Sequence, residues 1–147
     1  MDTLKIVCPH CEATNAIKIE ESKADIACQV CTRSMLETKP VDCDPEMFYT
    51  HLNENDIPVL VDFYSPLCAP CMKMAPDYES AAASLALEVR FIKVNTLEYP
   101  DLALKYGVNT LPTLIAFKQS KELNRFTSAL PEYQLKMWGE SLIQMVI

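Results

Sequence analysis

The sequence has 147 residues, of which 50% are apolar, so it is long enough for one compact domain with a small appendage. Its net charge of -7 argues against nucleic acid or an anionic membrane as a main partner. The apolar stretches are too short to span a membrane, and residues 1–5 lack the apolar core of an export signal, which predicts a cytoplasmic protein. Seven cysteines in such a protein favour metal binding and redox chemistry over structural disulfides.

The first segment carries two C-x-x-C pairs, Cys8 with Cys11 and Cys28 with Cys31. Each pair can supply two sulfur ligands to a tetrahedral zinc ion, with residues 16–20 as a short strand of an intervening hairpin. Because about forty residues bury little apolar surface, bound zinc would supply much of the folding energy of this segment. We therefore predict a structural zinc ribbon over residues 1–39. Two disulfides or an iron centre are the alternatives.

The polar residues 37–39 and Pro40 mark a boundary, so a second domain is expected over residues 40–147. Residues 41–43 are typical of a short edge strand. Asp44 and Pro45 are typical of a helix start, and this helix is expected to end near residue 53. Cys43 has no partner in a C-x-x-C pair, which is more often the mark of a packed thiol than of a regulatory one.

The apolar run of residues 59–64 predicts a central strand that is covered on both faces. Asp62 interrupts this run. If Asp62 is buried, desolvation raises its pKa toward neutrality and fits it for proton exchange with a nearby thiol. The alternative is a carboxylate turned to solvent at the end of the strand.

After a turn, Cys68-Ala69-Pro70-Cys71 opens a helix. A cysteine at a helix N-terminus lies near unpaired backbone N–H groups and the positive end of the helix dipole, and both favour the thiolate. The spacing lets the second cysteine displace a mixed disulfide that the first has formed. Cys68 and Cys71 are therefore a candidate dithiol/disulfide pair.

The remaining elements follow in chain order. The helix that begins near Cys68 is expected to continue to residue 87, with Pro76 inside it. Residues 89–95 predict a second apolar strand. This strand carries Lys93, which either pairs with Asp62 or extends to solvent. The remaining elements are a short helix that ends at Gly107, a hairpin of strands 111–117 and 122–126, and a last helix from Pro131 with an apolar face.

From residue 41 onward the chain resembles a thioredoxin, and with the four-cysteine segment it resembles the bacterial zinc-binding type. The matching motifs are residues 61–63 before the cysteine pair, residues 75–76 after it, Lys93, residues 106–108 and residues 111–113. The resemblance implies an α/β thioredoxin fold, with a central sheet flanked by helices, and a cis bond before Pro112.

The resemblance also implies roles for single residues. Cys68 would be the attacking thiolate and Cys71 the resolving thiol, while Asp62 would exchange a proton with Cys71 and Lys93 would tune it. The backbone of Leu111, beside Pro112, would bind an extended substrate segment. The apolar docking surface would consist of four residues: Leu67, Ala69, Pro70 and Leu111.

Several positions depart from the family pattern. Leu67 replaces the usual tryptophan, Ala69 the usual glycine, and Met72 the usual lysine, which here comes one residue later as Lys73. Ser128 stands where a glycine is expected near the docking surface, and Thr32 stands where a glycine usually follows the last ribbon cysteine.

The sequence thus predicts a monomeric cytoplasmic protein-disulfide reductase with structural zinc and no bound nucleotide. Its partners would be protein disulfides and an NADPH-dependent thioredoxin reductase, without nucleic acid or membrane. A binding module, chaperone or redox-responsive zinc adaptor with the thioredoxin fold is the main alternative. A disulfide isomerase or oxidase is a weaker one, because the cytosol is reducing.

Overall fold

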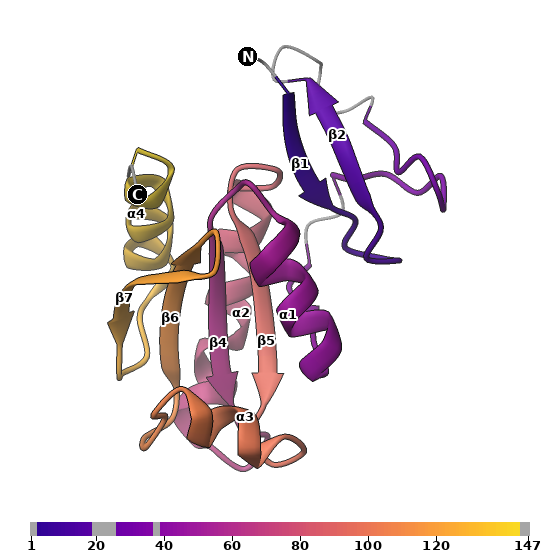
Figure 1. The fold of residues 1–147 in the computed structure, drawn as a ribbon. Helices are drawn as coiled ribbons and strands as arrows, with labels where there is room; N and C mark the ends of the chain where they lie inside the picture. The colour runs from indigo at the N-terminus through magenta and orange to yellow at the C-terminus, as the bar shows by residue number, and fades with distance from the viewer. Residues whose placement is uncertain (1–2, 19–25, 37–38, 145–147) are drawn as a thin grey trace.

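The computed structural model describes residues 3–18, 26–36 and 39–144. Its larger part is a five-stranded mixed sheet in the order β3-β5-β4-β6-β7 (Figure 1). The strands are β3 (Val41–Asp42), β4 (Val59–Tyr64), β5 (Arg90–Asn95), β6 (Thr113–Lys118) and β7 (Lys121–Phe126). Strands β3, β4 and β5 are parallel, and β6 runs antiparallel to both β4 and β7.

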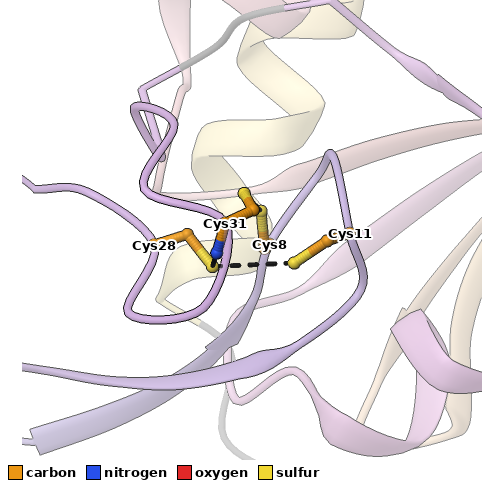
Figure 2. Close-up of side chains that lie close together, drawn as sticks. All are labelled: Cys8, Cys11, Cys28 and Cys31. Carbon is orange, nitrogen blue, oxygen red and sulfur yellow. Dashed lines mark hydrogen bonds between the residues drawn. The ribbon is translucent and has the colours of Figure 1, made fainter.

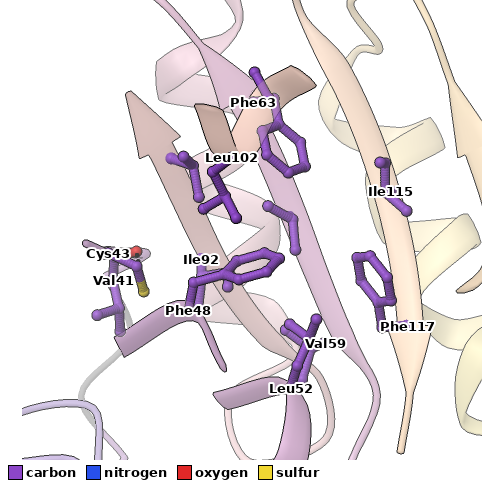
Figure 3. Close-up of a cluster of buried hydrophobic side chains, with 13 residues drawn as sticks. Val41, Cys43, Phe48, Leu52, Val59, Phe63, Ile92, Leu102, Ile115 and Phe117 are labelled. Carbon is purple, nitrogen blue, oxygen red and sulfur yellow. Dashed lines mark hydrogen bonds between the residues drawn. The ribbon is translucent and has the colours of Figure 1, made fainter. Parts of the chain in front are cut away.

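Helices cover both faces of this sheet, which confirms the predicted thioredoxin fold. Helix α1 (Pro45–Glu54) and α3 (Pro100–Lys105) pack on one face, and α2 (Ala69–Ser84) and α4 (Glu132–Ile143) pack on the other. Figure 3 shows the core under α1, in which Phe48 lies among side chains from β4, β5 and β6. All six residues of β4 are buried, as expected for a strand covered on both faces.

Most predicted elements differ from the observed ones only at their ends. Helix α2 ends at Ser84 rather than at residue 87, because the chain turns through Leu87, whose φ of 65° is left-handed, before it enters β5. The hairpin turn at Gln119 and Ser120 has positive φ at both residues, which suits the twist of β6 and β7. Met145 and Val146, one of which was predicted to continue the apolar face of α4, lie outside the described residues.

The N-terminal segment contains an antiparallel pair, β1 (Thr3–Val7) and β2 (Thr14–Lys18). The sequence pattern does not predict β1, and the predicted strand over residues 16–20 lies partly outside the described residues. The turn between β1 and β2 carries Cys8 and Cys11, and residues 26–36 bring Cys28 and Cys31 beside them (Figure 2). We call residues 3–18 and 26–36 the ribbon.

The ribbon is docked on the larger part of the chain through hydrogen bonds between side chains and the ribbon backbone, which sequence reasoning missed. The side chain of Asn55 accepts the N–H of Val7 at 2.8 Å, and the buried Arg90 donates to the Val7 carbonyl at 2.7 Å. Asp56 adds a third contact to the ribbon backbone, since its carboxylate accepts the N–H of Lys5 at 2.7 Å. Ile57 packs in the same apolar cluster as the ribbon. The two parts therefore share a buried interface.

Asn55→Ala tests this interface. The substitution leaves the buried N–H of Val7 without an acceptor, which costs about 1–3 kcal/mol. We expect the free energy of unfolding to fall by about this amount and the Val7 amide to exchange faster with solvent, as urea unfolding and hydrogen exchange would measure. Glu54→Ala, at an exposed position one residue earlier, serves as the control and should change neither quantity.

None of the described helices has the length and apolar character that a membrane crossing requires.

Candidate redox and metal sites

Cys68 and Cys71 form a disulfide at the start of α2, with their Cα atoms 5.2 Å apart. Cys68 is the N-cap of the helix, and its sulfur accepts the backbone N–H of Cys71 at 3.2 Å. The same position would stabilise a thiolate, because a helix N-terminus offers unpaired N–H groups and a positive dipole end. Strand β4 leads into this turn, since the chain runs from Tyr64 directly into the loop before Cys68.

The two sulfurs differ in accessibility. Cys68 is half-buried and is flanked by Leu67, whose exposed fraction is 80%, whereas Cys71 is only 2% exposed. An incoming disulfide can therefore reach Cys68 more easily than Cys71. This asymmetry fits an attacking thiol and a resolving thiol.

Asp62 lies inside the sheet and is 4% exposed, so the alternative of a solvent-facing carboxylate does not hold. Its Oδ1 atom has no hydrogen-bond partner among the described residues. Burial raises the pKa of Asp62 to about 7, an effect that the charge of Lys93 opposes and that of Asp42 reinforces. A carboxyl group with this pKa can exchange protons near neutral pH.

Lys93 is the neighbour of Asp62 in the register of β5 and β4. Its ammonium group lies 4.6 Å from the centre of the Tyr64 ring, and the Tyr64 hydroxyl donates to Asp42 at 3.0 Å. Sequence reasoning did not single out Tyr64 or Asp42. The sequence does indicate that Tyr64 shares a face with Asp62, since residues two apart on a strand point to the same side. The contact of Tyr64 with Asp42 depends on the order of the strands, which the sequence does not show.

The peptide bond between Leu111 and Pro112 is cis, as the resemblance implies. Thr113, the next residue, is paired with Phe63, so this bond lies at the end of the sheet from which the chain continues to Cys68. Among the predicted docking residues, Leu67, Ala69 and Pro70 are exposed and Leu111 is half-buried. A hollow of about 300 Å³ adjoins Pro70 and is lined also by Lys73, Met74, Asp77, Ala129, Leu130 and Pro131.

The four ribbon cysteines form one cluster, in which all sulfurs lie within 4.8 Å of one another. The sulfurs of Cys8 and Cys31 are 3.7 Å apart, and those of Cys11 and Cys28 are 3.6 Å apart (Figure 2). Tetrahedral zinc with Zn–S bonds of about 2.3 Å would hold its sulfurs about 3.8 Å apart. The four thiols are thus placed to bind a metal ion, and the geometry is compatible with zinc.

Within the cluster, hydrogen bonds favour the thiolate form of Cys28, whereas burial raises the pKa of Cys8. The N–H groups of Val30 and Cys31 donate to the sulfur of Cys28, and the side chain of Asn15 donates to it at 3.4 Å. These bonds, that of Cys31 first, lower the pKa of Cys28 to about 6. After the last cysteine, Thr32 has a φ of 68°, so it occupies the left-handed conformation for which glycine is usual.

Cys43 is the remaining thiol and lies in the apolar core under α1. Burial raises its pKa well above the ordinary value, which disfavours the reactive thiolate. This agrees with the prediction of a packed thiol.

Comparisons with known proteins agree with this geometry. The family model described as Thioredoxin matches residues 39–141. Thioredoxin C-3 of Corynebacterium nephridii is 30% identical over 139 residues, which cover 95% of each chain. Chloroplastic thioredoxin Y2 of Arabidopsis thaliana is 42% identical over 94 residues, which cover 64% of this chain and 56% of the relative. A solved structure of a mutant thioredoxin from Halobacterium salinarum has a TM-score of 0.67 and 28% identity, and covers 75% of this chain and 96% of that one.

A mixed sheet with a C-x-x-C disulfide at a helix N-terminus and a cis proline near the same sheet end defines a thiol-disulfide oxidoreductase. The chain belongs to the thioredoxin family. Thioredoxins reduce protein disulfides and are themselves reduced by thioredoxin reductase, and the pair of Cys68 and Cys71 fits the redox-active site of such an enzyme.

Proposed function

We propose that the protein is a monomeric cytoplasmic protein-disulfide reductase in which Cys68 attacks and Cys71 resolves. The observation that carries this proposal is the contrast between the half-buried Cys68, at the N-cap of α2, and the buried Cys71.

In the first step the Cys68 thiolate attacks one sulfur of a substrate disulfide. The substrate S–S bond breaks, and the other substrate sulfur leaves as a thiolate. A mixed disulfide between Cys68 and the substrate remains.

In the second step Asp62 accepts the proton of the Cys71 thiol, and the Cys71 thiolate attacks the Cys68 sulfur. The second substrate thiolate leaves, so the substrate has gained two electrons and the protein holds the disulfide seen in the structure. NADPH would restore the dithiol through a thioredoxin reductase. The apolar surface around Leu67 and Pro70 and the backbone of Leu111, beside Pro112, would hold the substrate during both steps.

The ribbon cysteines would bind zinc with a structural role, since four sulfur ligands complete a tetrahedral site and leave no open position for catalysis. Metal analysis of the purified protein should give one zinc ion per chain. Cys28→Ser should lose the metal while retaining the disulfide of Cys68 and Cys71. A chain that carries iron, or that pairs the ribbon cysteines as disulfides, would contradict the zinc assignment.

The test of the activity is reduction of insulin disulfides driven by NADPH and a thioredoxin reductase. Turnover is expected for the unchanged protein and for Cys43→Ser, which removes a thiol outside the redox site. Folded, metal-loaded protein that small reductants reduce but that shows no turnover would instead favour the binding-module alternative.

A further inference from the structure

Three charged side chains from adjacent strands lie in one row across the sheet. Asp42 of β3 is paired with Lys93 of β5, and Lys93 is paired with Asp62 of β4. Residues in register on parallel strands point to the same face, which here is the face under α2. Exposure decreases along the row: Asp42 is exposed, Lys93 is half-buried, and Asp62 is buried.

The side chain of Tyr64 spans from β4 to Asp42 and contacts Lys93 on the way. It starts on β4, and its hydroxyl reaches Asp42 on β3, with β5 between the two strands. The Tyr64 ring passes over Lys93, whose ammonium group lies 4.6 Å from the ring centre. Because Tyr64 is only 7% exposed, its ring also shields this side of Lys93 from water.

Lys93 thus stands between two carboxyl groups, of which one is held by a hydrogen bond and the other has an unpartnered oxygen among the described residues. We infer that Asp42 is a positioning residue of the redox site, which sets the protonation of Asp62 through Tyr64 and Lys93. This inference rests on the proposed function, because Asp62 matters there as the proton acceptor of Cys71.

The charges determine in which direction Asp42 changes the protonation of Asp62. The negative charge of Asp42 offsets the positive charge of Lys93 and repels a second negative charge on Asp62. Both effects favour the protonated form of Asp62, and they add to the rise of its pKa that burial chiefly causes. With Asp42 present, Asp62 is therefore a stronger base toward the Cys71 thiol than Lys93 alone would allow.

The other elements around Asp62 add no second carboxylate to the row within the described part of the chain. Leu114 of β6 is its neighbour on the other side. From α2, the Tyr78 hydroxyl lies 2.9 Å and 2.8 Å from the carbonyl oxygens of Leu60 and Ile92, so it is engaged by the backbone. Burial raises the pKa of Tyr64, and the charge of Glu98 adds to this rise.

The experiment is a titration of the Asp62 carboxyl carbon by NMR in the oxidised protein, in which Cys68 and Cys71 do not titrate. Asp42→Asn removes the charge at nearly constant shape and should lower the titration midpoint by about half a pH unit at low salt. In about 1 M salt, where the Debye length is about 3 Å, most of this difference should disappear. Glu140→Gln, which removes a charge from the exposed side of α4, is the matched control and should leave the midpoint unchanged.

An unchanged midpoint in Asp42→Asn at low salt would overturn the inference, as would an equal shift in Glu140→Gln. Insulin reduction by the unchanged protein is measured alongside. If the unchanged protein reduces insulin but the Asp62 midpoint is the same in Asp42→Asn, only the role of Asp42 is refuted. If the Asp62 midpoint shifts in Asp42→Asn but the unchanged protein does not reduce insulin, only the proposed reductase is refuted.

Discussion

Cys68→Ser should reduce the rate of insulin reduction by roughly a thousandfold or more, because a serine hydroxyl cannot replace the thiolate as nucleophile. The other cysteine of the pair, Cys71, is buried and cannot contact a protein disulfide directly. Alkylation with iodoacetamide near neutral pH should therefore also lose its fast phase. Insulin reduction that persisted in this variant would assign the nucleophile to another cysteine.

Cys71→Ser should fail in a different way. Cys68 still attacks, but nothing displaces the substrate, so the mixed disulfide accumulates. Mass spectrometry of a mixture with a disulfide-containing protein should detect this adduct in Cys71→Ser and not in Cys68→Ser. If both variants formed the adduct equally, the separate roles of the two sulfurs would be wrong.

Asp62→Asn should raise the free energy of unfolding of the oxidised protein at pH 8 by a few kcal/mol and leave it nearly unchanged at pH 4. The folded-state pKa of Asp62 is raised from 3.8 to about 7, so the buried group holds its proton in the folded state after the unfolded chain has released it. Unfolding then releases a proton between about pH 4 and pH 7. Stability falls as pH rises through this window, by up to about 1.4 kcal/mol per pH unit.

Guanidinium unfolding of the oxidised protein at several pH values measures this effect. Other buried groups titrate as well, among them His51, whose pKa burial lowers to about 3, so the informative quantity is the difference between variant and unchanged protein. Glu79→Gln, on the exposed side of α2, is the control. A difference that does not depend on pH would mean that Asp62 is not the group responsible.

The grouping of the cysteines at both sites could be predicted from the sequence because local spacing determines it. A C-x-x-C pair after an apolar strand places Cys68 at a helix start whatever the rest of the chain does. Asp62 was evident as a carboxylate within six residues that are otherwise apolar or aromatic. The ribbon cysteines were recognisable for the same reason, since each C-x-x-C pair is local.

The contacts that tune and connect these sites depend on strand order and docking, which local patterns do not contain. Tyr64 meets Asp42 because β3 joins the far edge of β5, although 22 residues separate the two side chains. Arg90 reaches Val7 across 83 residues, and in the sequence Arg90 is only a charged residue at the start of an apolar strand.

The interface around Val7 has a consequence for dividing the chain. A thioredoxin part that began at residue 40 would expose the apolar side chain of Ile57 and would leave the Arg90 guanidinium and the side-chain oxygen of Asn55 without their partners on Val7. Such a fragment would expose a new apolar patch at the end of the sheet remote from Cys68 and would tend to self-associate through it. The ribbon therefore covers this end of the sheet, in addition to holding four thiols that are placed to bind a metal ion.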